Sequence, residues 1–239
     1  LVQEYKLSPS PHVEGMWIGE THTLTFDQTT GEYRLVQRLT PPPEKRRTIT
    51  PNLTPRLIAI AETKVTEAFP NIDFVSFPQK TSFLTGGAHF DEATMETATH
   101  ISVPFGQSFY DIPVLLAFEP EFPLRVFVDS EGDVTTIIAR PFTASFKEST
   151  QHFSLSAQEA IKQIELGNAS IIDSFSESTF TPTLDKVVRG EFSSVTLEYR
   201  IDPTTNLLIP YYYFVGTLVN SENDIFSASV ITPAVRLSE

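Results

Sequence analysis

The side chains best suited to metal chemistry lie in the segment GGAHFDE. In this segment His89 is followed closely by Asp91 and Glu92. Imidazole and carboxylate groups together suit zinc or manganese. No second histidine follows four residues later, and Gly86 and Gly87 provide for a sharp bend. We therefore interpret this segment as a polar loop between strands, and we assign no metal ligand.

A second acidic segment, DSEGD, carries Asp129, Glu131 and Asp133. Three carboxylates this close together could bind calcium, but the segment lacks the spacing and the ligand count of a calcium-binding loop. Gly132 lies where a tight turn needs a positive φ. We therefore favour a hairpin turn between two strands.

Established catalytic motifs do not occur in the chain. It has no GxSxG nucleophile elbow, HExxH zinc motif, phosphate-binding loop or GxGxxG motif. With no cysteine, thiol nucleophiles, thiolate zinc sites, iron–sulfur clusters and disulfides are excluded. Glycosidase-type carboxylate pairs stay open, because the 30 acidic residues offer many pairs whose separation the sequence does not give. The five histidines are scattered: His12, His22, His89, His100 and His152.

The run from Tyr211 to Phe214 is the most distinctive aromatic feature. In a strand, Tyr211 and Tyr213 share one face, whereas Tyr212 and Phe214 share the other. One pair must belong to the core. We select Tyr211 and Tyr213 as the candidate interface pair, because tyrosine is enriched at protein interfaces. The alternative is that this pair covers a neighbouring part of the same chain.

Composition limits the classes of partner. The chain has 239 residues, 40% of them hydrophobic, and a formal net charge of −13. This length suffices for one large domain or two small ones. Nucleic acid is excluded as a partner, because phosphate binding needs a basic surface. The longest uncharged run, between Asp202 and Glu222, contains prolines and asparagines, so we expect no transmembrane span.

Residues 1–50 are predicted to form an N-terminal β arm. HTLTF and YRLVQRL alternate apolar and polar residues on either side of a turn at Gly31, which predicts a hairpin. A proline-rich connector, TPPPEKRR, follows. The chain begins at Leu1, which fits either a trimmed chain or a mature form that has lost a leader.

Residues 51–150 are predicted to form a first helix-plus-sheet unit. Thr54 is the expected N-cap, Pro55 suits the first helical position, and the helix should end at Phe69 before Pro70. Strands are then expected at 72–77, 97–103, 113–118, 124–128 and 134–139.

Residues 151–239 are predicted to form a second unit of the same design. Ser156 and Glu159 form a capping box, and Gly167 ends the helix. The segment SVTLEYRI should have an apolar face containing Val195 and Leu197 and an opposite, solvated face. Strands are expected at 169–175, 194–201, 207–219 and 225–232. The predicted fold is therefore α+β: two tandem helix-on-antiparallel-sheet units preceded by an N-terminal β-hairpin arm.

Several packing residues of residues 53–235 resemble a known group of proteins. A helix beginning LSAQEAIKQIELG and strands reading TLEYRI and LLIPYYYFVGTLV are similar to bacterial extracytoplasmic proteins of the YycH/YycI and PepSY-like (cystatin-like) kind. The first 50 residues lie outside the resemblance. The matching residues are Glu159, Ala160, Leu197, Tyr199, Leu208, Pro210, Tyr212, Phe214 and Gly216.

The resemblance implies a non-enzymatic protein located outside the cytoplasmic membrane or at the cell surface, anchored in its full-length form by an N-terminal segment. It would act by binding another protein, either a membrane or envelope component or a second copy of itself, and it supplies no catalytic residue or cofactor. The alternative is a structural subunit of a surface assembly that uses its N-terminal arm for strand addition. A hydrolase or metal-binding protein is the weakest alternative.

Overall fold

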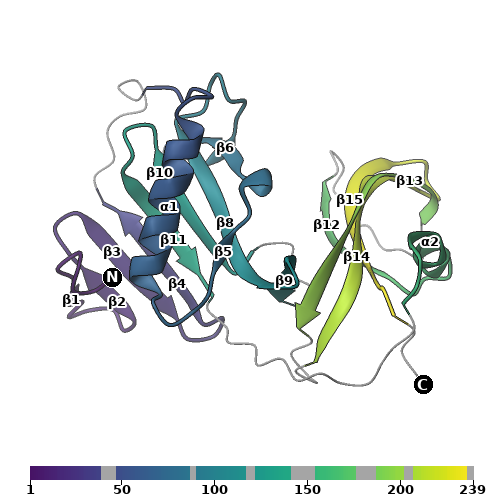
Figure 1. The fold of residues 1–239 in the computed structure, drawn as a ribbon, viewed down its shortest axis with the longest axis horizontal. Helices are drawn as coiled ribbons and strands as arrows, with labels where there is room; N and C mark the ends of the chain where they lie inside the picture. The colour runs from purple at the N-terminus through teal and green to yellow at the C-terminus, as the bar shows by residue number, and fades with distance from the viewer. Residues whose placement is uncertain are drawn as a thin grey trace. The chain divides into compact units, whose positions relative to one another are not determined.

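A computed structural model describes residues 1–38, 47–86, 90–116, 122–140, 154–175, 187–201 and 207–235. The chain divides into two compact units (Figure 1). The first contains residues 1–107 and 122–143, and the second contains residues 108–121 and 144–239. Residues 108–121 therefore belong to the second unit although the chain on both sides of them belongs to the first.

The first unit is built on an antiparallel sheet. A short 3₁₀ helix, Pro78–Lys80, lies between two of its strands in the chain. Its strands are β1 (Ser8–Pro9), β2 (Met16–Ile18), β3 (His22–Asp27), β4 (Glu32–Gln37), β5 (Val75–Ser76), β6 (Ser82–Thr85), β7 (Asp91–Glu92), β8 (His100–Phe109), β10 (Leu124–Asp129) and β11 (Val134–Ala139). They are ordered β1-β2-β3-β4-β11-β10-β8; β5 and β6 also pair with β8, and β7 pairs with β6.

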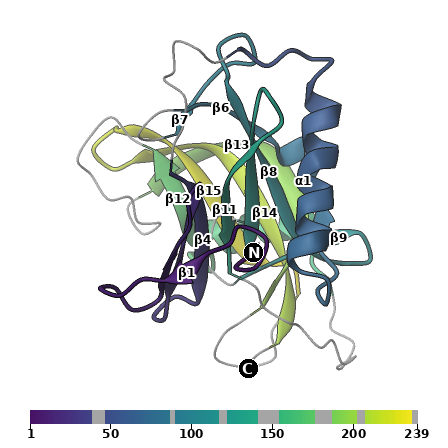
Figure 2. The same ribbon diagram turned by 90° about the vertical axis from the view of Figure 1, so that its left-hand side faces the viewer.

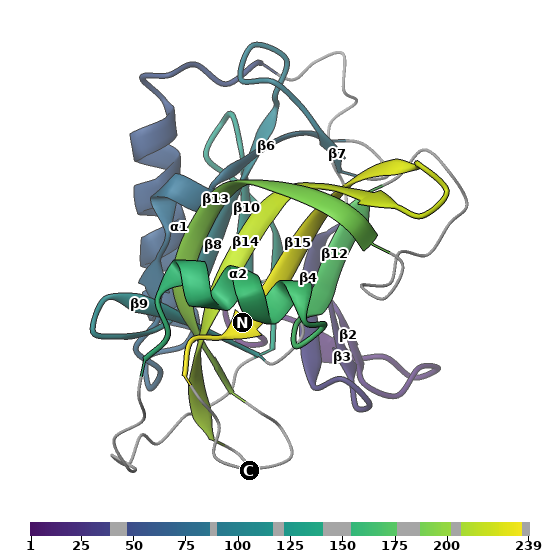
Figure 3. The same ribbon diagram turned by 90° about the vertical axis from the view of Figure 1, so that its right-hand side faces the viewer.

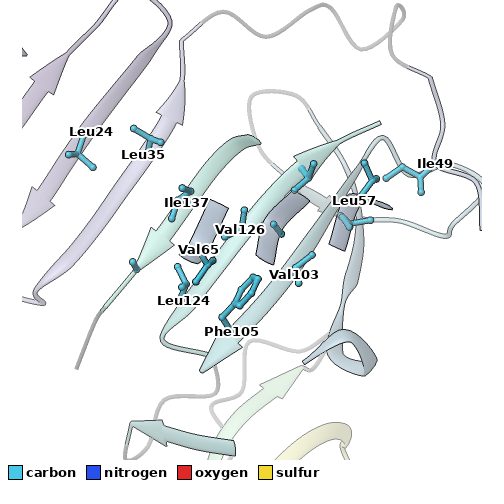
Figure 4. Packing of buried hydrophobic residues seen from close by; sticks show 14 of the residues in the cluster. Leu24, Leu35, Ile49, Leu57, Val65, Val103, Phe105, Leu124, Val126 and Ile137 are labelled. Carbon is cyan, nitrogen blue, oxygen red and sulfur yellow. The ribbon is translucent and has the colours of Figure 1, made fainter. Parts of the chain in front are cut away.

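Helix α1 (Thr54–Ala68) covers one face of this sheet (Figures 1 and 2). Its residues Leu57, Ala61 and Val65 are fully or almost fully buried. They recur at intervals of four residues, so they lie along one side of the helix. Figure 4 shows this core, to which β3, β4, β8, β10 and β11 contribute residues including Leu24, Leu35, Val103, Phe105, Leu124, Val126 and Ile137.

The second unit contains a mixed sheet. Its strands are β9 (Ile112–Leu116), β12 (Ser170–Phe175), β13 (Val187–Ile201), β14 (Leu208–Asn220) and β15 (Ile225–Pro233), in the order β9-β13-β14-β15-β12. β9 runs parallel to β13, whereas the other neighbours are antiparallel. Helix α2 (Ala157–Glu165) lies across β14 and β15 (Figure 3), where Ala160 packs against Phe214 and Val230.

Local sequence signals explain where the helices begin and end. The capping box of α2 is confirmed: the Ser156 side chain accepts a hydrogen bond from the Glu159 backbone N–H, and the Glu159 carboxylate accepts one from the Ser156 N–H. Gly167 has a φ of 80°, as a helix stop requires. The prediction that Thr54 caps α1 is wrong, because Leu53 occupies the N-cap position and makes no side-chain capping bond.

The predicted fold class, two tandem helix-on-antiparallel-sheet units preceded by a hairpin arm, is wrong. The 22–37 hairpin forms, but β4 also pairs with β11, so the N-terminal strands are part of the first sheet and not a separate arm. Among the described residues, 15 strands form a mixed sheet, whereas the two α-helices contain only 15 and 9 residues. The pairing buries Leu35 completely, which a free hairpin could not do.

Strand lengths also differ from the predictions. The pair β10 and β11, joined at Gly132 with a φ of 96°, confirms the predicted hairpin. The strand expected at 72–77 is shorter in the structure, Val75–Ser76, whereas the strand expected from residue 194 begins earlier, at Val187.

Neither helix in the described part of the chain is long and apolar enough to cross a membrane.

Candidate functional site: the outer edge of strand β13

Strand β13 is paired unequally on its two sides. On one side it pairs with β14 from Val187 to Ile201. On the other side it pairs with β9 only from Tyr199 to Ile201. Within the described residues, no strand pairs with this outer edge between residues 187 and 198. Backbone N–H and C=O groups along such an edge are free to pair with another extended chain.

Two β-bulges bend this edge. The register of β13 against β14 shifts between Val187 and Arg189 and again between Phe192 and Ser194. Bulges increase the local twist and limit open-ended pairing along an edge. From Ser194 onward the register is regular. The straight, unpaired part of the edge is therefore the stretch from 194 to 198.

Side-chain exposure changes along β13: residues 193–197 are all exposed, whereas Glu198, Arg200 and Ile201 are buried. Val195 and Leu197 remain 44% and 38% exposed, whereas Glu198 and Arg200 are only 5% and 1% exposed. Residue alternation correctly places the two apolar residues on one face and the two charged residues on the other. Charged residues are usually exposed and large apolar residues usually buried, so both observations depart from the common pattern.

The buried charges are paired with each other. The Arg200 Nε donates to Glu198 Oε1 at 2.7 Å, and the Nη2 lies 2.5 Å from the same oxygen. The Nη1 donates to the Leu116 carbonyl of β9 at 3.3 Å. This arrangement compensates for desolvation of both charges. The C-terminal end of β13 is thus mostly buried within the second unit, whereas residues 193–197 are exposed on both faces.

Aromatic residues extend the apolar face beyond Leu197. Tyr199 follows on the same face, and the Phe109 ring packs edge-on against it with centroids 5.2 Å apart. Tyr110 contacts Phe109 at 4.5 Å and is itself 77% exposed. We call the five residues Val195, Leu197, Tyr199, Phe109 and Tyr110 the edge strip.

The turn that carries Tyr110 has an unusual backbone. Tyr110 and Asp111 have φ values of 51° and 61°. Two consecutive positive φ angles are typical of a primed hairpin turn, where asparagine and glycine are the usual residues. A bulky aromatic residue in this conformation is strained. The Tyr110 side chain is exposed at this turn.

The core cluster under helix α2 does not include the residues of the edge strip. Its core contacts lie over β14 and β15, with Phe214, Leu218, Phe226, Ala228 and Val230. Tyr212 of β14 lies beside Leu197 across the strands and donates from its hydroxyl to the Leu155 carbonyl at 3.0 Å. Val187 and Phe192 of β13 also pack against this cluster, whereas Val195 and Leu197 are not among its residues.

The sequence-predicted interface pair lies on the opposite face of the second sheet. Tyr211 and Tyr213 are both half-buried and share a face, as the alternation of the strand predicts. The Tyr213 hydroxyl lies 2.9 Å from Ser229 Oγ, and Tyr211 stands across from Glu198. The structure therefore brings this pair to the face that carries the buried Glu198–Arg200 ion pair.

Sequence reasoning missed the exposure of Val195 and Leu197. Alternation shows which residues share a face, but it does not show which face is covered. One available signal was that Glu198 and Arg200 have opposite charges and are two residues apart on a strand, so they can pair side by side. Tyr110 had no signal, because a tyrosine is not expected in a turn with a positive φ.

The predicted metal candidates do not assemble into a site. His89 lies outside the described residues, while Asp91 and Glu92 form the short strand β7. Asp129 accepts three backbone hydrogen bonds within its own turn, from Glu131, Gly132 and Asp133. In the described part of the chain, no group of three or more histidine, aspartate or glutamate residues could hold a metal ion.

One cluster of titratable groups lies in the first unit. Lys64 of α1 forms an ion pair with Glu4 and lies 5.1 Å from the centroid of the Tyr5 ring. His22 stacks against Tyr5 with centroids 4.2 Å apart. Burial raises the pKa of the Tyr5 hydroxyl and lowers the pKa of His22. The cluster fastens the N-terminal residues to α1.

A shallow groove runs beside this cluster along the outer side of α1. Arg56, Ile60, Thr63 and Val134 line it, together with Lys64 and other residues of the helix. Lys64 already pairs with Glu4 and Glu67. The groove therefore offers no converging set of free polar groups for a small ligand.

Comparison with protein-family models, curated proteins and solved structures finds no match for this chain.

Proposed function

We propose that this chain is a non-enzymatic binding protein that takes up an extended segment of a partner protein on the outer edge of β13. The exposed stretch 193–197 of β13, along which no described strand pairs on the outer side, carries this proposal. Its charged residues Glu198 and Arg200 are buried as a pair, while Val195 and Leu197 remain exposed beside unpaired backbone. An edge that displays both hydrogen-bonding groups and apolar side chains suits strand addition.

The two kinds of contact have different roles. Main-chain hydrogen bonds along residues 194–198 would supply affinity for any extended chain. Specificity would come from the edge strip, because side chains of the added strand would alternate between the strip and the opposite face. Tyrosine and other aromatic residues are common among the few residues that dominate binding energy. We therefore expect Tyr110 and Tyr199 to flank the bound segment.

The compartment is proposed on the resemblance alone: an extracytoplasmic or cell-surface protein anchored in its full-length form. The alternative, a structural subunit that donates its N-terminal arm, has weaker support. Strands β1 to β4 are already paired in succession, and β4 pairs with β11. Donating them to a neighbouring subunit would require these pairs to break first.

The test starts from a library of random ten-residue peptides displayed on phage and selected on the unmodified chain. Selected peptides are then measured by fluorescence anisotropy against Leu197→Lys, which introduces a charge into the edge strip. We expect this variant to weaken binding by about tenfold or more, because a lysine on an edge opposes strand addition. Leu166→Lys is the matched control, since Leu166 is 71% exposed next to the last turn of α2.

Amide hydrogen exchange locates the bound peptide. We expect exchange to slow at residues 194–198 when a selected peptide is added, because newly formed backbone hydrogen bonds protect the amides. Equal binding to the unmodified chain, Leu197→Lys and Leu166→Lys would contradict the proposal. Protection confined to other strands would contradict it as well.

A further inference from the structure

The negative charge of the chain is concentrated in the unit that contains the edge strip. Residues 108–121 and 144–239 contain 15 aspartates and glutamates against 6 lysines and arginines, a formal charge of −9 out of the total of −13. The other unit, although longer, accounts for the remaining −4. A charged surface raises the local concentration of oppositely charged partners and repels like charges.

Two exposed carboxylates lie on the same elements as the edge strip. Asp111 follows Tyr110 directly in the strained turn, and Glu191 lies on β13 beyond the second bulge. Among the described residues of this unit, exposed cationic side chains are limited to Lys162 on α2 and Arg189 on β13. The third cation, Arg200, is buried and neutralises Glu198. Arg189 lies two residues from Glu191 on the same strand, so the acidic character of this region rests on Asp111 and on the overall charge of −9 of the unit.

We infer that the segment bound at the β13 edge is basic, with apolar side chains alternating with lysine or arginine. This inference rests on the function proposed above and specifies its ligand. In an added strand, every second side chain would contact the edge strip, and the side chains between them would point to the opposite face. Lysine or arginine on either side of the apolar positions would be attracted by Asp111 and Glu191. A second copy of this acidic chain is disfavoured by the same charges.

Defined peptides test this inference directly. Three ten-residue peptides alternate valine with lysine, with glutamine or with glutamate, and each carries the same neutral solubilising tag. We expect the lysine peptide to bind about tenfold more tightly than the glutamine peptide at 50 mM salt, and the glutamate peptide to bind most weakly. At 500 mM salt the advantage of the lysine peptide should shrink to about twofold, because salt screens exposed charges.

Variants show whether the nearby carboxylates cause the preference. The double variant Asp111→Asn and Glu191→Gln should lower the affinity for the lysine peptide severalfold and leave the glutamine peptide unaffected. Asparagine also tolerates the positive φ at position 111. Glu165→Gln is the matched control, because Glu165 is an exposed carboxylate at the last position of α2.

The outcomes separate this inference from the proposed function. If the glutamine peptide binds as tightly as the lysine peptide and both lose affinity for Leu197→Lys but not for Leu166→Lys, the charge inference is overturned and strand addition stands. If the lysine peptide binds all of these variants equally, its binding is non-specific attraction to an acidic chain, and the inference is overturned. If neither these peptides nor any library peptide protects the amides of residues 194–198, both proposals fail.

Discussion

His22 is a buried histidine that the fold holds in its neutral form. Its side chain is 6% exposed and stacks on Tyr5. The Nε2 atom lies 3.3 Å from the Val134 carbonyl oxygen, so this nitrogen carries the proton and donates. The Nδ1 atom lies 2.9 Å from the Thr21 hydroxyl and can accept from it. Desolvation lowers the pKa of His22 below its usual value, even though the Val134 carbonyl acts in the opposite direction.

This lowered pKa predicts a loss of stability in mild acid. The unfolded chain binds a proton at His22 near the ordinary histidine pKa of about 6.5, whereas the folded chain binds it only at lower pH. The contribution of His22 is therefore fully present above about pH 6.5 and is lost as the pH falls toward the folded pKa. His22→Gln should flatten the dependence of the unfolding free energy on pH between 7 and 5.

Urea denaturation at a series of pH values measures this effect. His12→Gln provides the control, because His12 is an exposed histidine outside this cluster. Parallel curves for the unmodified chain and His22→Gln would show that His22 does not contribute to the acid sensitivity.

Glycine at position 216 permits the close approach of β14 to the bulged part of β13. A Cβ atom added at Gly216 would lie 2.7 Å from Phe192 Cα and even closer to the Glu191 carbonyl oxygen. These are backbone atoms, so they cannot move aside as a side-chain end can. The second bulge of β13 therefore depends on a residue without a side chain in its partner strand.

Gly216→Ala should lower the free energy of unfolding by about 1–3 kcal/mol, because overpacking here must displace backbone. Gly190→Ala is the matched comparison on β13. Its added Cβ would meet Leu218 Cδ2 at 2.5 Å, and this flexible side-chain end can rotate away. We expect a smaller loss for Gly190→Ala, as measured by urea denaturation. Equal losses in the two variants would indicate that the backbone contact is not the cause.

Local signals predicted most elements of the fold. The α2 capping box, the stop at Gly167 and the turn at Gly132 each depend on neighbouring residues, and each is confirmed. Pairing between distant segments was not predictable in this way. The β4–β11 contact joins residues about a hundred positions apart, and the parallel β9–β13 pair joins Val114 to Tyr199. The edge strip was missed for the same reason, since its exposure depends on where α2 and β9 end.

The division of the chain into two units makes residues 108–121 a detached part of the second unit. Within that unit, β9 provides the parallel neighbour of β13 and the Leu116 carbonyl that accepts from Arg200. A fragment of residues 144–239 lacks both. We predict that this fragment melts at a lower temperature alone than in the presence of excess synthetic peptide 108–121, because a ligand that binds only the folded form stabilises it.

Circular dichroism melting with increasing peptide concentration checks this prediction. The control peptide carries Leu115→Asp, since Leu115 is almost fully buried in β9 and a charge there should abolish the effect. A melting temperature that does not depend on the peptide would show that β9 adds nothing to the stability of the second unit.

During translation, strand β9 is synthesised well before β13, the strand with which it pairs in parallel. Val114 pairs with Tyr199, so 199 − 114 = 85 residues must be translated between the two. At about 5–20 residues per second, β9 waits roughly 4–17 s for its neighbour. Throughout that interval Val114 and Leu115, which are buried in the finished protein, lack their neighbours in β13. Nascent β9 is thus kept without its β13 partner during synthesis, as β4 is kept even longer without β11.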